Sequence, residues 1–360
     1  MAVSEFELSP PISASRRHSS AGRRNGMTAK ITVIIVNYNS DARLARAVAC
    51  LAAQTFKDFE VIIADNASSD ASLEFAQPPS LSLRIVRNDA NLGFAKGNNE
   101  AAKLASGEWL ALLNPDAYPE PDWLEQLVKA AERYPNVDAF GSTQIDANDP
   151  TKLDGAGDAY QAFGLPYRGH FGWPITTLPE EGECFAPCAA AALYRRSTFE
   201  ALGGFDESFF CYGEDVDLGF RLRLAGGRAV QVRAARVLHE GSGITGRRSD
   251  FAIYHGHRNR VWTFVKDMPG PIFWPALPFH LILNAALFVR CAAGGTGGAY
   301  LRAVADAVRG LGPVWKSRKA VQADRRAGIG EIAHALVWFP LRAFRRKAFI
   351  QPVETARRSD

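Results

Sequence analysis

The stretch ITVIIVNYNS, residues 31–40, decides the fold class. Its first six residues form an unbroken run rich in β-branched side chains, which is typical of a strand buried on both faces of a parallel sheet. The run ends at Asn37, and an amphipathic helical pattern follows, with Ser40 or Asp41 as its cap. A buried strand that leads through a short polar turn into a helix predicts an α/β protein.

The same alternation repeats downstream. Further strands are predicted at Phe59–Ala64, Leu83–Val86 and Trp109–Leu113, and the segment 91–99 opens another helix. Strands that alternate with helices indicate right-handed crossovers and a parallel sheet. Ligands of such sheets bind beyond the carboxyl ends of the strands, so the polar residues that follow each strand mark the expected site.

The second half of the chain is less regular. Residues 150–183 are rich in Gly and aromatic residues and are expected to form a long functional loop. A helix is predicted at Glu214–Ala225 and a short strand at Ala229–Val232, and the segment 237–243 is expected to lead into a loop.

Composition suggests three parts within the 360 residues. Residues 1–28 read as a disordered leader, with Met27 as a possible true start; residues 29–250 form the catalytic domain; residues 251–360 form a helical, basic extension. From residue 290 to the end, 14 Arg and Lys residues face 5 Asp and Glu residues. This charge favours an acidic partner, and the absence of an aromatic-basic groove argues against nucleic acid. Five cysteines without zinc-site spacing indicate reduced thiols in the cytoplasm.

Three strand-end motifs carry candidate chemistry. Asp65 could bind a nucleobase or ribose, or could only cap the next helix. Asp116, in Asn114-Pro115-Asp116, could hold a divalent metal on a diphosphate, or could belong to an ordinary turn. His239 could be a second metal ligand, although a lone histidine is more often structural.

The pair Glu214-Asp215 opens a helix. Two adjacent acids raise the pKa of a buried carboxylate, which suits a base that removes a proton from a hydroxyl, whereas the structural alternative places both acids at a favourable helix dipole. We expect Asp215 to be the base and Glu214 to support it. Arg258 is a candidate for binding a phosphate, whereas His255 and His257 point apart on a helix and make a poor metal pair.

Six ordered motifs together resemble the inverting family 2 glycosyltransferases of GT-A fold, in the bacterial rhamnosyltransferase-like branch. The motifs are VIIVNYN at 33–39, DNASSD at 65–70, NLGFAKGNN at 91–99, LNPD at 113–116, LGGFDE at 202–207 and EDVD at 214–217. The resemblance implies a Rossmann-like, mainly parallel sheet flanked by helices, followed by the C-terminal helical, membrane-proximal extension.

The resemblance also implies roles for individual residues. Asp215 would be the general base with Glu214 beside it, and Asp116 and His239 would hold Mn²⁺ or Mg²⁺, with an Asn at position 114 in place of the first acid of the DxD signature. The residues expected to bind the nucleotide sugar are Asn37, Asp65, Asn66, Gly93, Asn98, Asn114 and Arg258.

The implied reaction is the inverting transfer of a sugar, with rhamnose from dTDP-rhamnose favoured, to a hydroxyl of a lipid-linked or cell-surface glycan. Two alternatives stay open. A nucleotidyltransferase would need a Gly-rich basic loop after the first strand, where residues 37–40 read NYNS. A degenerate GT-A protein that only binds glycans is the non-enzymatic alternative.

Two segments of the extension suggest a membrane partner. Pro271–Val289 contains 19 residues without a formal charge and could just span a bilayer, although its three prolines argue against a simple span. Ala333–Phe349 interleaves apolar and basic residues, which is typical of interfacial helices. We expect peripheral or monotopic attachment to the cytoplasmic face of the inner membrane; alternatively, these helices pack on the catalytic domain.

Overall fold

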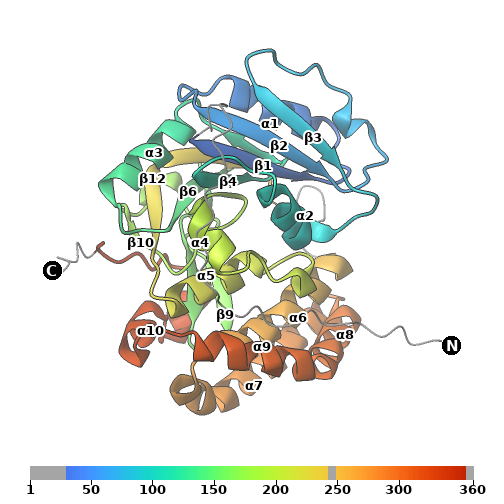
Figure 1. Cartoon of the computed structure of the whole chain (residues 1–360). Helices are drawn as coiled ribbons and strands as arrows, with labels where there is room; N and C mark the ends of the chain where they lie inside the picture. The colour runs from blue at the N-terminus through green and yellow to red at the C-terminus, as the bar shows by residue number, and fades with distance from the viewer. Residues whose placement is uncertain (1–29, 242–248, 354–360) are drawn as a thin grey trace, which may run out of the picture.

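The computed structural model describes residues 30–241 and 249–353. The expected leader at 1–28, with Met27, lies outside the described residues. A twisted, mainly parallel sheet forms the upper part of the molecule and a helical layer forms the lower part (Figure 1). This architecture confirms the expected α/β fold with a C-terminal helical region.

The central sheet has the order β10-β12-β6-β11-β4-β1-β2-β3, with β5 paired to β12 and β7 paired to β6. The strands are β1 (Ile31–Asn37), β2 (Phe59–Asp65), β3 (Ser82–Arg87), β4 (Trp109–Leu113), β5 (Ala117–Pro119), β6 (Ala139–Asp146), β7 (Leu153–Gly155), β8 (Asp158–Gln161), β9 (Leu165–Arg168), β10 (Gly182–Glu183), β11 (Ala191–Arg195) and β12 (Ala229–His239). Strands β1 to β4 pair in parallel, and β11 runs antiparallel between β4 and β6.

Helices cover both faces of the sheet. The α-helices are α1 (Ala42–Ala52), α2 (Gly93–Ala102), α3 (Trp123–Arg133), α4 (Arg196–Ala201), α5 (Glu214–Leu224), α6 (Asp250–Asp267), α7 (Gly270–Ala293), α8 (Gly297–Arg309), α9 (Leu311–Ala323), α10 (Ile329–Ala335) and α11 (Pro340–Phe344). Alternate residues of β1 enter two different cores: Val33 and Ile35 pack with α1 and α3, whereas Ile34 and Val36 pack with α2. This explains why β1 has no polar residue apart from Thr32 before its end, since a strand buried on both faces has no solvent-facing side.

Two expectations for the second half were wrong. The segment 150–183 is not a plain loop, because it contains β7, the β8–β9 hairpin and β10. The strand expected at Ala229–Val232 continues to His239 through an irregularity between Val232 and Arg236. The irregularity absorbs residues 233–235, and pairing with β6 then resumes, so that His239 lies on a strand.

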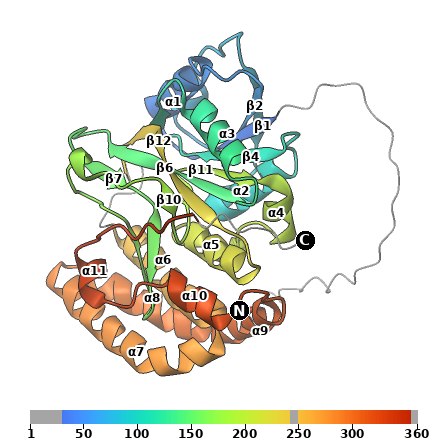
Figure 2. The same cartoon turned by 90° about the vertical axis from the view of Figure 1, so that its left-hand side faces the viewer.

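The helical layer packs against the catalytic part of the chain. Helix α6 contacts α5, and α7 to α9 lie beyond it, away from the sheet (Figure 2). The chain then returns to the sheet: Gln351 and Glu183 exchange two backbone hydrogen bonds of 2.7 and 2.9 Å. This bridge joins the end of the extension to the edge strand β10.

Candidate active site

Polar side chains at the ends of β1 and β2 form one hydrogen-bonded cluster. Asn37 Nδ2 donates to Asp65 Oδ1 at 2.8 Å and to Ser72 Oγ at 2.9 Å, and the parallel register places Asn37 directly beside Asp65. The backbone N–H of Ser68 donates to the other oxygen of Asp65 at 3.3 Å. The structure thus brings together the first two residues expected to bind the nucleotide.

Asn66 links this cluster to the start of α2. Its Nδ2 donates to the carbonyl of Gly93 at 3.0 Å, and its Oδ1 accepts from Asn88 at 2.9 Å. Gly93 has φ +78°, and a Cβ there would lie 2.5 Å from the ring of Phe210. The requirement for glycine is therefore explained by packing within the protein. Asn98 is buried, and its side chain donates to the carbonyl of Phe94 within α2.

The predicted metal ligands lie side by side. Pairing of His239 with Ala117 places the end of β12 next to the turn that carries Asp116, and His239 Nε2 lies 3.4 Å from Asp116 Oδ1. On the other side of the ring, Nδ1 lies 2.7 Å from Asp154 Oδ2. Burial alone would lower the pKa of His239, but the bonds to Asp116 and Asp154 raise it.

This arrangement fits a divalent metal. Among the described residues, His239 Nε2 is buried without a hydrogen bond of good geometry, and so is Asn114 Oδ1 on the same turn as Asp116. A histidine whose Nδ1–H is held by a carboxylate presents Nε2 as a ligand in a fixed orientation. Imidazole and carboxylate together suit Mn²⁺ or Mg²⁺ with further oxygen ligands from a diphosphate.

The predicted base opens α5. Asp215 Oδ2 accepts from the backbone N–H of Ala189 at 3.1 Å, and Oδ1 accepts from that of Val216 at 2.8 Å. Glu214 is buried, and both its burial and the charge of Asp215 raise its pKa. Asp215 is partly exposed and is therefore the more accessible of the two carboxylates.

A second carboxylate faces Asp215. Ligand atoms of Asp158, Cys188 and Asp215 lie within 4.8 Å of one another. Burial raises the pKa of the Cys188 thiol to about 12, so this residue is a neutral thiol beside the two carboxyl groups. Burial and the charge of Asp215 also raise the pKa of Asp158. The cluster therefore places a second carboxyl group beside the predicted base.

The turn before Glu214 is strained and is held by one asparagine. Phe210 and Tyr212 have φ values of +63° and +71°, which cost about 1–3 kcal/mol each in residues other than glycine. Asn259 Nδ2 on α6 donates to the carbonyls of Phe209, Cys211 and Tyr212 at 2.7–2.9 Å. Asn259 therefore positions the segment that leads to the predicted base.

Arg258 lies beside Asn259. Its Nη2 donates to the carbonyls of Ser208 and Phe209 at 2.9 and 3.1 Å, and its guanidinium stacks over Trp262. Arg258 thus binds the same turn as Asn259, and the structure does not bring it to the cluster of Asn37 and Asp65. Its role in phosphate binding stays a prediction.

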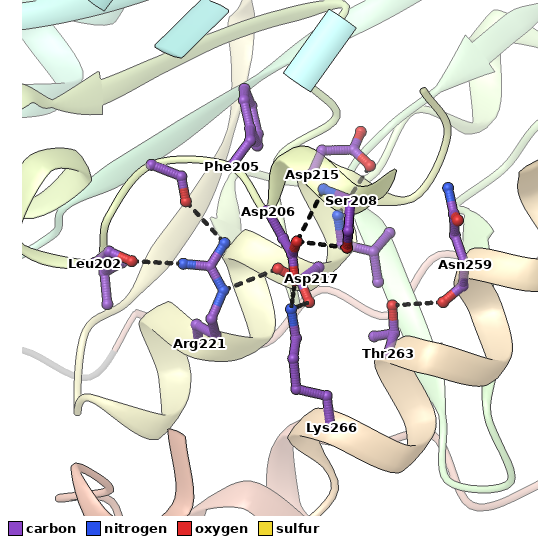
Figure 3. Close-up of polar contacts among 12 residues, drawn as sticks. Leu202, Phe205, Asp206, Ser208, Asp215, Asp217, Arg221, Asn259, Thr263 and Lys266 are labelled. Atoms are coloured by element: carbon purple, nitrogen blue, oxygen red, sulfur yellow. Dashed lines mark hydrogen bonds and ion pairs between the residues drawn. The ribbon is translucent and has the colours of Figure 1, made fainter. Parts of the chain in front are cut away.

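A buried ion cluster supports α5 from below (Figure 3). Arg221 donates to Asp217 at 2.8 Å and to the carbonyls of Leu202 and Gly204 at 2.7 and 2.8 Å. Lys266 of α6 lies 2.6 Å from Asp206 and also pairs with Asp217. Since removing one partner would leave a buried charge, this cluster fixes α5 on α6.

Sequence reasoning missed two site residues. Asp154 was not singled out because the Gly-rich segment that carries it has no clear periodicity, and Asp158 lies in the same segment. Both belong to strands: β7 places Asp154 beside His239, and β8, in the separate β8–β9 hairpin, places Asp158 beside Asp215. Their signal was limited to acids next to glycine, in Asp154-Gly155 and Gly157-Asp158.

The mainly parallel sheet with helices on both faces, and the polar residues gathered at the ends of its strands, are those expected of a glycosyltransferase of GT-A fold. Comparison with known proteins agrees with this class. A family model described as glycosyl transferase family 2 matches residues 32–203. The chain belongs to this family.

The chain is also similar to two curated relatives. The chain is 30% identical over 298 residues to the N-acetylglucosaminyl-diphospho-decaprenol L-rhamnosyltransferase of Mycobacterium tuberculosis, covering 72% of this chain and 95% of that protein. It is 33% identical over 275 residues to the O-antigen biosynthesis protein RfbC of Myxococcus xanthus, covering 72% of this chain and 21% of the relative. The first match spans nearly the whole relative.

Solved structures agree on the fold. Residues 1–349 of S. aureus TarS in complex with UDP-GlcNAc superpose with a TM-score of 0.55 at 18% identity, covering 86% of this chain and 93% of that one. GalNAc-T7 with UDP, GalNAc and Mn²⁺ superposes with a TM-score of 0.53 at 18% identity, covering 67% and 48%. These neighbours establish the GT-A-like arrangement of sheet and helices.

Proposed function

We propose that this protein is an inverting glycosyltransferase that transfers rhamnose from dTDP-rhamnose to a hydroxyl of a lipid-linked glycan. The observation that carries the proposal is the position of Asp215, which is partly exposed at the start of α5 and has a carboxylate oxygen within 4.8 Å of one of Asp158. The relative from Mycobacterium tuberculosis is named a rhamnosyltransferase acting on a diphospho-decaprenol acceptor, and this name supports both substrate classes.

The proposed reaction is a single displacement. The acceptor hydroxyl gives its proton to Asp215, and its oxygen forms a bond to the anomeric carbon while the bond from that carbon to the diphosphate oxygen breaks. Attack from the face opposite the diphosphate inverts the anomeric configuration. The electron pair of the broken bond leaves with the diphosphate, where negative charge develops.

Asn37 and Asp65 would bind the nucleoside, because their side chains hold each other at the carboxyl end of β1 and β2. Asp116 and His239 would hold a divalent metal, with the Oδ1 of Asn114 available to the same region. When bound, such a metal neutralises charge on the diphosphate. The Mn²⁺ in the GalNAc-T7 structure supports a metal of this kind.

The proposal includes association with the cytoplasmic face of the inner membrane. A lipid-linked acceptor lies in a membrane, and within the described residues one helix, α7, is long and apolar enough by length and composition to cross a bilayer. How the protein meets the membrane is taken up below.

The test is thermal stabilisation of the purified protein by a panel of nucleoside diphosphates, each with Mn²⁺, with Mg²⁺ and with chelator. We expect dTDP to raise Tm most, and we expect the effect to shrink in chelator and in Asp116→Ala. Nucleoside triphosphates are tested in parallel. Stabilisation by a triphosphate, together with release of pyrophosphate from it, would favour the nucleotidyltransferase alternative. No response to any nucleotide would overturn the proposal in favour of a glycan-binding protein.

A further inference from the structure

We propose that the outer face of α7, together with the α10–α11 segment, lies in the plane of an anionic lipid bilayer and docks the enzyme there. We call this surface the apolar face. Its exposed large apolar residues are Trp274, Phe279, Leu281, Ile282 and Val289 on α7 and Trp338, Phe339, Leu341 and Phe344 on the following segment. The inference rests on the proposed function for the membrane partner and specifies how it is met.

Helix α7 has two apolar sides, of which one is buried in the protein and the other is exposed. Ile272, Phe273 and Ala276 are buried in the helical layer, whereas the large residues of the outer side are 50–66% exposed. No charged residue occurs between Pro271 and Val289. Only 22% of the most apolar 18 residues of α7 are buried, so α7 is not a core helix. Its outer side also lacks the polar residues that a surface helix carries.

The contacts of α7 with the rest of the protein favour an in-plane helix over a spanning one. Phe273 packs on Phe264 of α6 with ring centroids 5.3 Å apart. The half-exposed Phe279 stacks on Phe163, which lies in the turn between β8 and β9, with ring centroids 4.7 Å apart, and the Nδ1 of the buried His280 lies 2.8 Å from the carbonyl of Phe163. A spanning helix would give up these contacts. A helix lying in the interface keeps them and buries only its outer side in lipid.

Charge identifies the bilayer as anionic. Arg345, Arg346 and Lys347 are exposed directly after the apolar residues of α11, and Arg290 is exposed at the end of α7. The β8–β9 hairpin ties the two halves of the face together, because Phe163 stacks on α7 and Tyr167 donates to the carbonyl of Lys347 at 3.1 Å. Basic residues beside an inserted apolar face each add about 1 kcal/mol at an anionic surface.

The same hairpin connects the apolar face to the active site. In its register Asp158 pairs with Arg168 at the catalytic end, and Gln161 pairs with Leu165 near the tip that touches α7. Gln161 lies three residues after Asp158 along β8, which corresponds to a distance of roughly 10 Å. A polyprenyl acceptor embedded in the bilayer could therefore present its sugar near Asp215 without leaving the membrane.

The experiment is flotation of the purified full-length protein with preformed vesicles of phosphatidylcholine, with and without an equal share of phosphatidylglycerol. We expect at least tenfold stronger binding to the anionic vesicles. Leu281→Glu/Ile282→Glu should reduce that binding at least tenfold, because it places charges at the centre of the face. Arg345→Glu/Lys347→Glu should remove the preference for anionic lipid.

Leu104→Glu is the matched control, since Leu104 is an exposed leucine on the catalytic part of the chain. It should bind vesicles like the wild type, and all variants should keep the wild-type Tm and its increase with dTDP. A wild-type protein that binds dTDP but not vesicles would overturn this inference and leave the proposed function standing. Equal vesicle binding by Leu281→Glu/Ile282→Glu and the wild type would also overturn it.

Discussion

Nδ1 of His239 lies 2.7 Å from a carboxylate oxygen of Asp154, and both side chains are buried. Asp154 also pairs with Arg168 through the same oxygen, Oδ2, so Arg168 partly balances the charge of the carboxylate that holds the imidazole. The pair fixes the orientation of the ring and directs Nε2 toward Asp116. Metal affinity should therefore depend on a residue that is not itself a ligand.

Asp154→Asn tests this dependence. An amide in place of the carboxylate weakens the bond to His239, so the affinity for Mn²⁺ in the presence of dTDP should fall about 10- to 100-fold. Isothermal titration of Mn²⁺ measures it, and Asp149→Asn, a nearby partly exposed acid, is the control. An unchanged affinity in Asp154→Asn would show that Asp154 has only a structural role.

Asn259 should matter for activity although it lies on α6. Asn259→Ala removes three hydrogen bonds to the strained turn and should lower the free energy of unfolding by about 1–3 kcal/mol. It should also lower kcat, because the turn positions Asp215. Asn259→Asp keeps the shape but cannot donate, so it should behave like Asn259→Ala, whereas the exposed Asn148→Ala should not. Retained kcat in both Asn259 variants would contradict the positioning role.

The pH dependence of stability should reveal Glu214. Its folded-state pKa is raised above 4.5, so the folded protein holds this proton more tightly than the unfolded chain does, and Glu214 contributes less stability as pH rises past 4.5. Glu214→Gln removes this loss. Its Tm should exceed that of the wild type at pH 8, and the difference should shrink toward pH 4.

Thermal unfolding between pH 4 and pH 8 measures this difference. Glu74→Gln is the matched control, because Glu74 is exposed. A difference in Tm between Glu214→Gln and the wild type that does not change with pH would contradict the raised pKa.

Membrane docking should be sensitive to salt. Because the basic residues around the apolar face are exposed, their attraction to anionic lipid is screened as the Debye length shortens. Flotation at 0.5 M NaCl should show weaker binding of the wild type than at 0.1 M. The binding that remains at 0.5 M should come from the apolar side chains. Binding that is independent of salt would remove the basic residues from the docking mechanism.

Sequence patterns predicted the first half of the fold closely. Strands such as β1 are buried on both faces, so their apolar runs are unbroken and their ends are marked by polar residues such as Asn37 and Asp65. The same logic placed Asp116 and His239 at one sheet edge, where the structure brings them together. Local pattern was sufficient wherever burial is continuous along a strand.

The segment 150–183 could not be predicted in the same way. Its strands are two to four residues long, too short for alternation to appear, and they are held by pairing with distant residues such as Ala186 and Gln351. Asp154 and Asp158 therefore reach the site through tertiary contacts that no local pattern encodes. The reason for Gly93 was also out of reach, because it depends on contact with Phe210.

The central claim is that Asp215 removes the acceptor proton in a sugar transfer. The most direct test is product formation from dTDP-rhamnose and a polyprenyl-diphospho-N-acetylglucosamine acceptor by the wild type and by Asp215→Asn, with dTDP affinity measured for both. We predict transfer by the wild type and a loss of about 10²- to 10⁴-fold in kcat in the variant at unchanged dTDP affinity. Transfer at the wild-type rate by Asp215→Asn would contradict the account.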